Sequence, residues 1–233
     1  MGAIAENISA VTKNIQEAAR RAGRDPADIT LVAVTKTVET SRAAECLDCG
    51  CVNLGENRVQ ELTEKYDILL QYNPIWHMIG HLQTNKVKQV IGKAALIHSA
   101  DSYKLCEKIS QCASARGPGG GQKADILIEV NMGGEDTKAG LAPEGAGRFA
   151  AEAAGLPGIS IKGLMTVAPY VANPEDVREI FKKMRKLFVD IKQKNYDNID
   201  MKVLSMGMTN DYCVAIEEGA TMVRIGTGIF GSR

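Results

Sequence analysis

The sequence predicts an α/β protein built as a single (β/α)8 TIM-type barrel with an extra helix at the N-terminus. Short apolar runs recur eight times along the chain, and stretches with helical periodicity separate them. The chain has 233 residues, close to the length that eight strand–helix units occupy. A doubly wound open sheet is disfavoured, because no G-x-G-x-x-G turn follows the first strand. We therefore expect residues 1–233 to form one domain.

The elements follow from the pattern of apolar residues. A leading amphipathic helix carries Ile4, Ile8, Val11 and Ile15, which are spaced to lie on one face. The run Ile29–Thr35 is almost entirely β-branched or apolar, as in a buried parallel strand. Similar runs predict the later strands at Cys51–Leu54, Ile75–Ile79, Leu96–His98, Ile126–Val130, Ile159–Met165, Lys202–Leu204 and Met222–Ile225.

Of the helices between these strands, the clearest has apolar residues on one face from Val177 to Ile191. Asn173 is suited to its N-cap, and Pro174 to its first position. A shorter helix is expected over Ser41–Cys49. The patch GPGGG at 117–121 is interpreted as a flexible connector ahead of the fifth strand.

Composition excludes several classes of protein. Lys and Arg number 28, as do Asp and Glu, so the formal net charge is zero and nucleic acid is disfavoured as a partner. The chain lacks both a membrane-spanning apolar run and a secretory signal, so we expect a cytoplasmic protein that does not bind membranes. The six cysteines lack the spacing of a zinc site, and the role of the cluster Cys46, Cys49 and Cys51 stays open.

The carboxyl ends of the strands carry the expected chemistry, as in other barrels of this type. Lys36 ends the first strand, and an amine in a desolvated pocket is favoured in the neutral form that attacks an aldehyde. Glycine-rich turns at 205–209 and 226–228 follow the last two strands, where a phosphate commonly binds. Together they predict a phosphorylated aldehyde or ketone held as a Schiff base. A surface lysine remains the simplest alternative, and a cofactor-free aldolase or sugar-phosphate barrel is another.

Several blocks resemble one family over nearly the whole chain. They are LVAVTK ending at Lys36, LGENRVQE, WHMIGHLQTNK, IEVNMGGEDTKAGL, GLMTVAP, LSMGMTNDY and VRIGTGIFG. This pattern resembles the pyridoxal 5′-phosphate (PLP) homeostasis proteins, single-domain relatives of the alanine racemase barrel. The resemblance implies a PLP-binding barrel of fold type III.

The resemblance also implies residue roles. Lys36 would hold PLP as a covalent aldimine, and Arg224 would face the pyridine nitrogen. The other implied cofactor-binding residues are Ser205, Gly226 and Thr227 at the phosphate, together with Met206 and Asn57. His77 and Asn85 lie in signature blocks without an assigned role. Asp211 and Tyr212 are expected to begin a helix, and Thr209 stands where the family usually has Ser.

The function implied by the resemblance is PLP homeostasis, in which a monomeric protein would hold PLP and supply it to apo-enzymes. An arginine at the pyridine nitrogen cannot leave a proton there, which weakens PLP as an electron sink. Alanine racemase needs a tyrosine from a second domain as its other base, and we expect none here because the chain ends at Arg233. We therefore expect little or no turnover, the alternative being a racemase-like enzyme that uses Lys36 as base.

Overall fold

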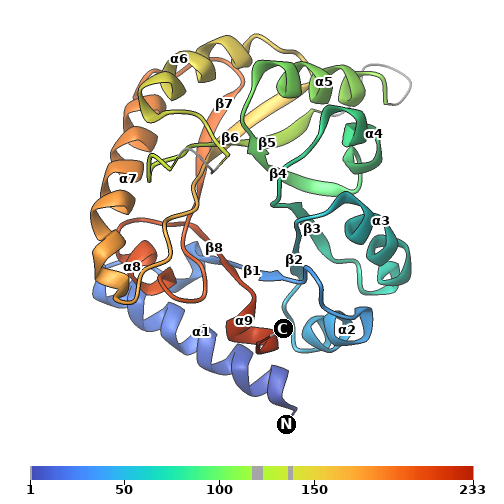
Figure 1. The fold of residues 1–233 in the computed structure, drawn as a ribbon, viewed down its shortest axis with the longest axis vertical. Coiled ribbons are helices and arrows are strands. Elements are labelled where there is room, and N and C mark those ends of the chain that lie inside the picture. Colours follow the sequence, from blue (N-terminus) through green and yellow to red (C-terminus); the bar gives the residue numbers. More distant parts are fainter. Residues whose placement is uncertain (1, 117–122, 136–138, 233) are drawn as a thin grey trace.

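Eight parallel strands form a closed barrel surrounded by helices in the computed structural model, which describes residues 2–116, 123–135 and 139–232 (Figure 1). The strands follow one another around the barrel in sequence order, and β8 (Met222–Ile225) pairs with β1 (Thr30–Val34) to close it. The (β/α)8 barrel predicted from the sequence is therefore confirmed, as is the additional helix α1 (Ala3–Arg21).

The other strands lie close to the predicted runs. They are β2 (Asn53–Glu56), β3 (Ile75–Met78), β4 (Ala94–Ala100), β5 (Ala124–Glu129), β6 (Ile159–Met165) and β7 (Ile199–Ser205). The predicted bounds of β6 and β8 coincide with those observed. The strand β2 lies two residues later than predicted, because its second half contains Glu56, a charged residue that the apolar pattern cannot assign to a buried strand.

Helices cover the outside of the barrel. They are α2 (Thr40–Asp48), α3 (Val59–Ile68), α4 (Val87–Val90), α5 (Tyr103–Ser114), α6 (Pro143–Ala154), α7 (Arg178–Gln193), α8 (Tyr212–Glu217) and α9 (Thr227–Phe230). The apolar stripe predicted for the first helix is buried along its whole length. Asn173 caps as predicted, its side chain accepting from Glu175 N at 3.3 Å, but it caps a 3-10 turn, Pro174–Val177, that leads into α7.

The core has two parts. The larger lies between the strands and the surrounding helices, and the smaller fills part of the barrel interior with Val32, Leu96, Leu127, Met165 and Met222. The interior also contains buried polar side chains, although apolar side chains alone could fill a barrel core. Three of them, Glu56, Glu129 and Ser205, are the last residues of β2, β5 and β7.

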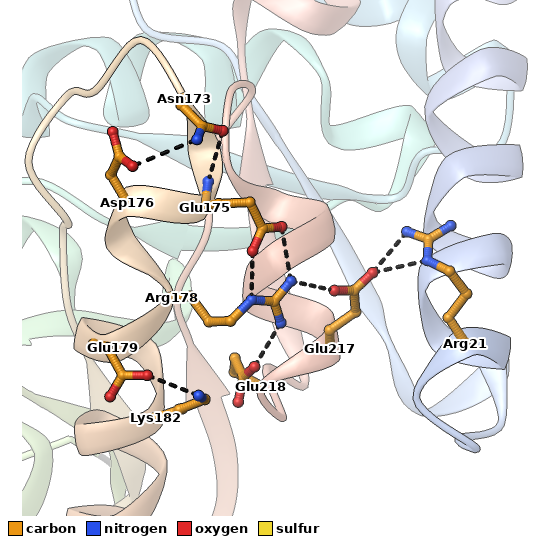
Figure 2. A network of polar contacts seen from close by, with 9 residues as sticks. All are labelled: Arg21, Asn173, Glu175, Asp176, Arg178, Glu179, Lys182, Glu217 and Glu218. Carbon is orange, nitrogen blue, oxygen red and sulfur yellow. Dashed lines mark hydrogen bonds and ion pairs between the residues drawn. The ribbon is translucent and has the colours of Figure 1, made fainter.

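An ion-pair network ties three of the outer helices together (Figure 2). Arg178, at the start of α7, contacts Glu175, Glu217 and Glu218 at 2.6 to 2.7 Å. Glu217, at the end of α8, also pairs with Arg21 of α1 at 2.8 Å. Because Arg178 is bonded to several carboxylates at once, this network fixes the relative positions of α1, α7 and α8 better than isolated surface pairs would.

All six cysteines of the sequence lie in the described part of the chain. All six cysteines are free thiols, and Cys49 directly follows the end of α2. Within residues 2–116, 123–135 and 139–232, no cluster of His, Cys, Asp and Glu is placed to hold a metal ion. No helix in these ranges combines the length and apolarity that crossing a membrane requires. The GPGGG patch at 117–121 lies outside the described residues.

Candidate cofactor site

Lys36 lies just past the end of β1, in a pocket at the carboxyl end of the barrel. Thr35 before it is fully buried, whereas Lys36 itself is half-buried. The pocket measures about 420 Å³ and is lined by Val34, Lys36, Pro169, Tyr170, Met208, Thr209, Asn210, Asp211, Arg224, Gly226 and Thr227. A larger hollow of about 770 Å³ lies at the amino ends of β3 to β5, around Trp76, where barrels of this type do not carry their chemistry.

Side chains from α3 hold the backbone on both sides of Lys36. The Lys65 ammonium donates to the carbonyl oxygen of Thr35 at 2.6 Å. The Thr37 N–H donates to a carboxylate oxygen of Glu61 at 2.7 Å. Thr37 has a φ of 58°, a left-handed conformation that β-branched residues rarely adopt. Helix α3 therefore stabilises an unusual turn whose central residue is Lys36.

Lys65 reaches that turn as part of a buried ion pair with Glu56 of β2. Its ammonium lies 2.7 Å from Glu56 Oε1, which also accepts from the Thr35 hydroxyl at 2.6 Å. Glu56 is fully buried, and burial raises the pKa of this carboxyl while the bonds from Lys65 and Thr35 oppose that shift. The turn at Lys36 thus rests on a charge pair buried beside the strand ends.

The opposite wall of the pocket is formed by the two glycine-rich turns. The Gly228 N–H donates to the Thr209 hydroxyl at 3.2 Å, which joins the turn after β8 to the turn after β7. In the latter turn, the Met208 N–H donates to Asp211 at 2.6 Å, and Gly207 has a φ of 92° that favours glycine. Gly226 and Thr227 begin α9, and the first N–H groups of a helix lack partners within the helix. This wall is suited to an anion.

Arg224 forms the floor between these two walls. It projects from β8, is 4% exposed and donates to Ser205 Oγ at 2.6 Å and to the Thr166 carbonyl oxygen at 2.8 Å. Burial lowers the pKa of Arg224 to about 10, with Asp211 and Glu129 opposing the shift, so the guanidinium stays charged near neutral pH. These two bonds engage only some of the guanidinium N–H groups, and Arg224 lines the pocket.

Two buried histidines lie behind Ser205 in the barrel interior. His98 Nδ1 lies 3.1 Å from Ser205 Oγ, and His98 Nε2 lies 3.0 Å from His77 Nδ1. His77 Nε2 is 3.1 Å from Asn53 Oδ1. Burial lowers the pKa of His77 to about 4 and the pKa of His98 well below its usual value. Both rings are therefore neutral near pH 7.

The pocket brings together four of the residues implied by the family resemblance: Lys36, Arg224, Gly226 and Thr227. Ser205 and Met206 are fully buried and do not line it, and the Ser205 hydroxyl is bonded to Arg224 and His98. Asn57 lies in a separate hollow beside Glu61 and His81. Asn85 is exposed. Asp211 and Tyr212 begin α8 as expected, although Asp211 also lines the pocket.

Sequence reasoning missed the supporting groups of the site. His98 ends the predicted apolar run Leu96–His98 and Glu129 ends β5, so the same signal that singled out Lys36 could have found them. Lys65 gives no such signal, because a lysine on an amphipathic helix is normally solvated. Thr209 was noted only as a departure from the family pattern, but its hydroxyl is the group that joins the two glycine-rich turns.

Glu129 and the two histidines make opposite contributions to the pH dependence of stability. Burial, reinforced by Asp101, raises the pKa of Glu129 to about 7, so its stabilisation is lost as pH rises from about 4.5 through 7. The buried neutral histidines do the reverse, because their stabilisation is lost as pH falls below 6.5 toward 4. In the native chain the two effects partly cancel.

Without the Glu129 carboxyl, the pH dependence of stability should be set mainly by the two buried histidines. We expect the free energy of unfolding of Glu129→Gln to rise more steeply between pH 4.5 and 6.5 than that of the native protein, by about 1–3 kcal/mol over the range. Urea unfolding at four pH values would measure both curves. Parallel curves would show that Glu129 does not ionise abnormally in the folded chain.

Comparisons with known proteins agree with this geometry. The sequence model of the family described as the N-terminal domain of alanine racemase matches residues 7–233. The pyridoxal phosphate homeostasis protein of Aquifex aeolicus is 46% identical over 228 residues, covering 98% of this chain and 97% of the relative. A crystal structure of a protein from Bifidobacterium adolescentis superposes with a TM-score of 0.92 at 36% identity, covering 98% of this chain and 94% of the other.

A further similar structure contains a ligand. PipY of Synechococcus elongatus, solved with PLP bound, has a TM-score of 0.83 at 29% identity, and the match covers 98% of this chain and all of PipY. The full-length identity to the Aquifex protein and the family match over residues 7–233 lead to the same assignment. This chain belongs to the pyridoxal phosphate homeostasis protein family, whose members share the barrel of the alanine racemase N-terminal domain.

Proposed function

We propose that this chain binds PLP in the pocket around Lys36, holds it as a Schiff base and contributes to intracellular vitamin B6 homeostasis. One observation carries the proposal: a single pocket brings together the Lys36 amine, the buried Arg224 guanidinium and the Gly226–Thr227 turn. These groups match three of the polar parts of PLP, namely its aldehyde, its pyridine nitrogen and its phosphate. The volume of about 420 Å³ is suited to a ligand of this size.

Each residue has a distinct role in this proposal. The Lys36 amine adds to the aldehyde and releases one water molecule as the C=N bond forms. Arg224 donates a hydrogen bond to the pyridine nitrogen without giving up its proton. The N–H groups of the Gly226–Thr227 turn, with the Thr209 hydroxyl, bind the phosphate, and Ser205 supports Arg224 from beneath. When bound, PLP supplies an electron sink, which an arginine partner keeps weak.

We propose further that the protein is a carrier of PLP with little turnover. Racemisation needs a second base held within hydrogen-bond reach of the substrate, on the face opposite Lys36. Among the tyrosines, Tyr170 lines the pocket, but it is 89% exposed and surrounded mainly by solvent. A side chain with that freedom is poorly suited to act as a positioned base. Supply of PLP to apo-enzymes fits a pocket whose lining includes this exposed side chain.

The first test is Lys36→Ala. We expect the purified native protein, incubated with PLP, to show the yellow absorption of a Schiff base, and the variant to lose it. Borohydride reduction followed by peptide mass mapping should place the adduct on Lys36. The control is Lys88→Ala, an exposed lysine on α4, which should retain the absorption and the adduct. A native protein that stays colourless, or an adduct that maps to another lysine, would contradict the proposal.

The same preparation tests the alternative racemase activity. Native protein loaded with PLP should interconvert amino-acid enantiomers far more slowly than the ~10 s⁻¹ typical of enzymes. A rate near that value which disappears in both Lys36→Ala and Tyr170→Phe would establish an enzyme with these two bases. We expect no such rate.

A further inference from the structure

A column of polar side chains crosses the barrel interior beneath the pocket. It begins at Asn53 of β2, passes through His77 of β3, His98 of β4 and Ser205 of β7, and ends at Arg224 of β8. Its four contacts span 2.6 to 3.1 Å, and the two histidines are 3% and 0% exposed. Apolar side chains would fill this space at a lower cost of desolvation, so the column needs an explanation beyond packing.

The hydrogen-bond direction of the column follows from its end at Arg224. A guanidinium can only donate, so Ser205 Oγ accepts from Arg224. The Ser205 hydroxyl then donates to His98 Nδ1, the ring atom that faces it. A neutral His98 that accepts at Nδ1 carries its proton on Nε2, and that N–H donates to His77 Nδ1. The protonation state of each group is set by the one before it.

The far end of the column agrees with this direction. His77 accepts at Nδ1, so its proton lies on Nε2, which faces the carbonyl oxygen of the Asn53 side chain. The opposite direction would make Ser205 Oγ accept from both His98 and Arg224, leaving its own hydrogen without an acceptor in the column. The direction from Arg224 to Asn53 is the one that satisfies every group.

We propose that His98 and His77 are positioning residues, which act through Ser205 to hold Arg224 in the orientation that meets the ligand. This proposal rests on the proposed function, since it takes PLP as that ligand. Ser205 Oγ and the Thr166 carbonyl oxygen accept from different nitrogens of the guanidinium and so define its plane. The column keeps the Ser205 lone pairs aimed at Arg224 by drawing the hydroxyl hydrogen toward His98.

The protonation pattern is testable without any ligand. The chain has three histidines, and the third, His81, is exposed and serves as an internal reference. In the 15N-labelled apo protein at pH 7, long-range 1H–15N spectra should show both His77 and His98 as neutral rings protonated at Nε2. A ring protonated at Nδ1, or at both nitrogens, would overturn the proposed direction of the column.

Variants test the effect on Arg224. We expect Ser205→Ala and His77→Leu to bind PLP about tenfold more weakly than the native protein and to shift the pH midpoint of its yellow absorption. His77→Asn keeps an acceptor close to the position of Nδ1 and should stay within about twofold of the native affinity. Neither histidine lines the pocket, so a merely structural role would lower the melting temperature and leave the absorption unchanged.

The outcomes separate the two proposals. If the native protein fails to bind PLP, the proposed function fails, while the spectra of the apo protein still test the column. If the native protein binds but Ser205→Ala and His77→Leu bind equally well, the positioning role is wrong. It is also wrong if His77→Asn loses as much affinity as His77→Leu. Should His77→Leu fail to fold, Ser205→Ala, which removes a single oxygen, decides the question.

Discussion

Replacing Lys65 by methionine should lower the free energy of unfolding by about 3–5 kcal/mol, because it strands a charge inside the protein. The Lys65 side chain is 7% exposed and that of Glu56 is fully buried, so their mutual attraction offsets a large cost of desolvation. Without the ammonium, Glu56 Oε1 keeps the bond from Thr35, while the Thr35 carbonyl oxygen loses the bond from Lys65. Urea unfolding, followed by the fluorescence of buried Trp76, would measure the loss.

The matched control is the double variant Glu56→Gln with Lys65→Met. Removing both charges avoids the stranded carboxylate, so the double variant should regain at least half of the stability that Lys65→Met loses. Equal losses in the single and double variants would show that the ion pair is not the source of the effect. Because Lys65 also holds the turn at Lys36, we expect Lys65→Met to form the Schiff base with PLP less completely even at temperatures where it is folded.

Much of the fold could be predicted from the sequence because burial in a barrel is periodic. Each strand is covered on its outer face by helices, so β6 and β8 appear as short apolar runs with clear ends. Prediction of strand bounds fails where buried polar residues stand at or near the end of a strand, whereas the buried Arg224 inside β8 did not hide that strand. The strand β2 ends at Glu56, so the predicted apolar run begins and ends two residues before the strand does. The strand β4 continues past His98 to Ala100, so the predicted run is shorter than the strand.

The candidate site divides in the same way. Lys36, Gly226 and Thr227 were identified because strand ends and glycine-rich turns leave a local pattern in the sequence. The neighbours of Ser205 could not be identified in this way. Its contact to His98 joins residues 107 positions apart, and its contact to Arg224 joins side chains 19 positions apart on two neighbouring strands. The sequence therefore predicts which groups face the pocket better than it predicts which groups hold them.

The largest single-site effect that the structure predicts concerns Gly163 in β6. Its φ is 153°, and a Cβ at this position would lie 1.7 Å from the carbonyl oxygen of Val203 on β7. The obstacle is backbone of a neighbouring strand, which cannot move without opening the β6–β7 ladder. We expect Gly163→Ala to lose more than about 4 kcal/mol of unfolding free energy, or to fail to fold.

The control is the same substitution in a helix. Gly147 lies inside α6, and a Cβ there would meet no atom within 4 Å, so Gly147→Ala should gain about 0.5–1 kcal/mol. A Gly163→Ala variant whose unfolding free energy lies within about 1 kcal/mol of that of the native protein would contradict the steric argument.

The substitution at Gly163 should also affect the candidate site, because β6 leads directly to Thr166, whose carbonyl oxygen accepts a hydrogen bond from Arg224. If Gly163→Ala does fold, we therefore expect it to bind PLP more weakly than Gly147→Ala, since displacing β6 against β7 separates the two acceptors, Thr166 and Ser205, that orient the guanidinium.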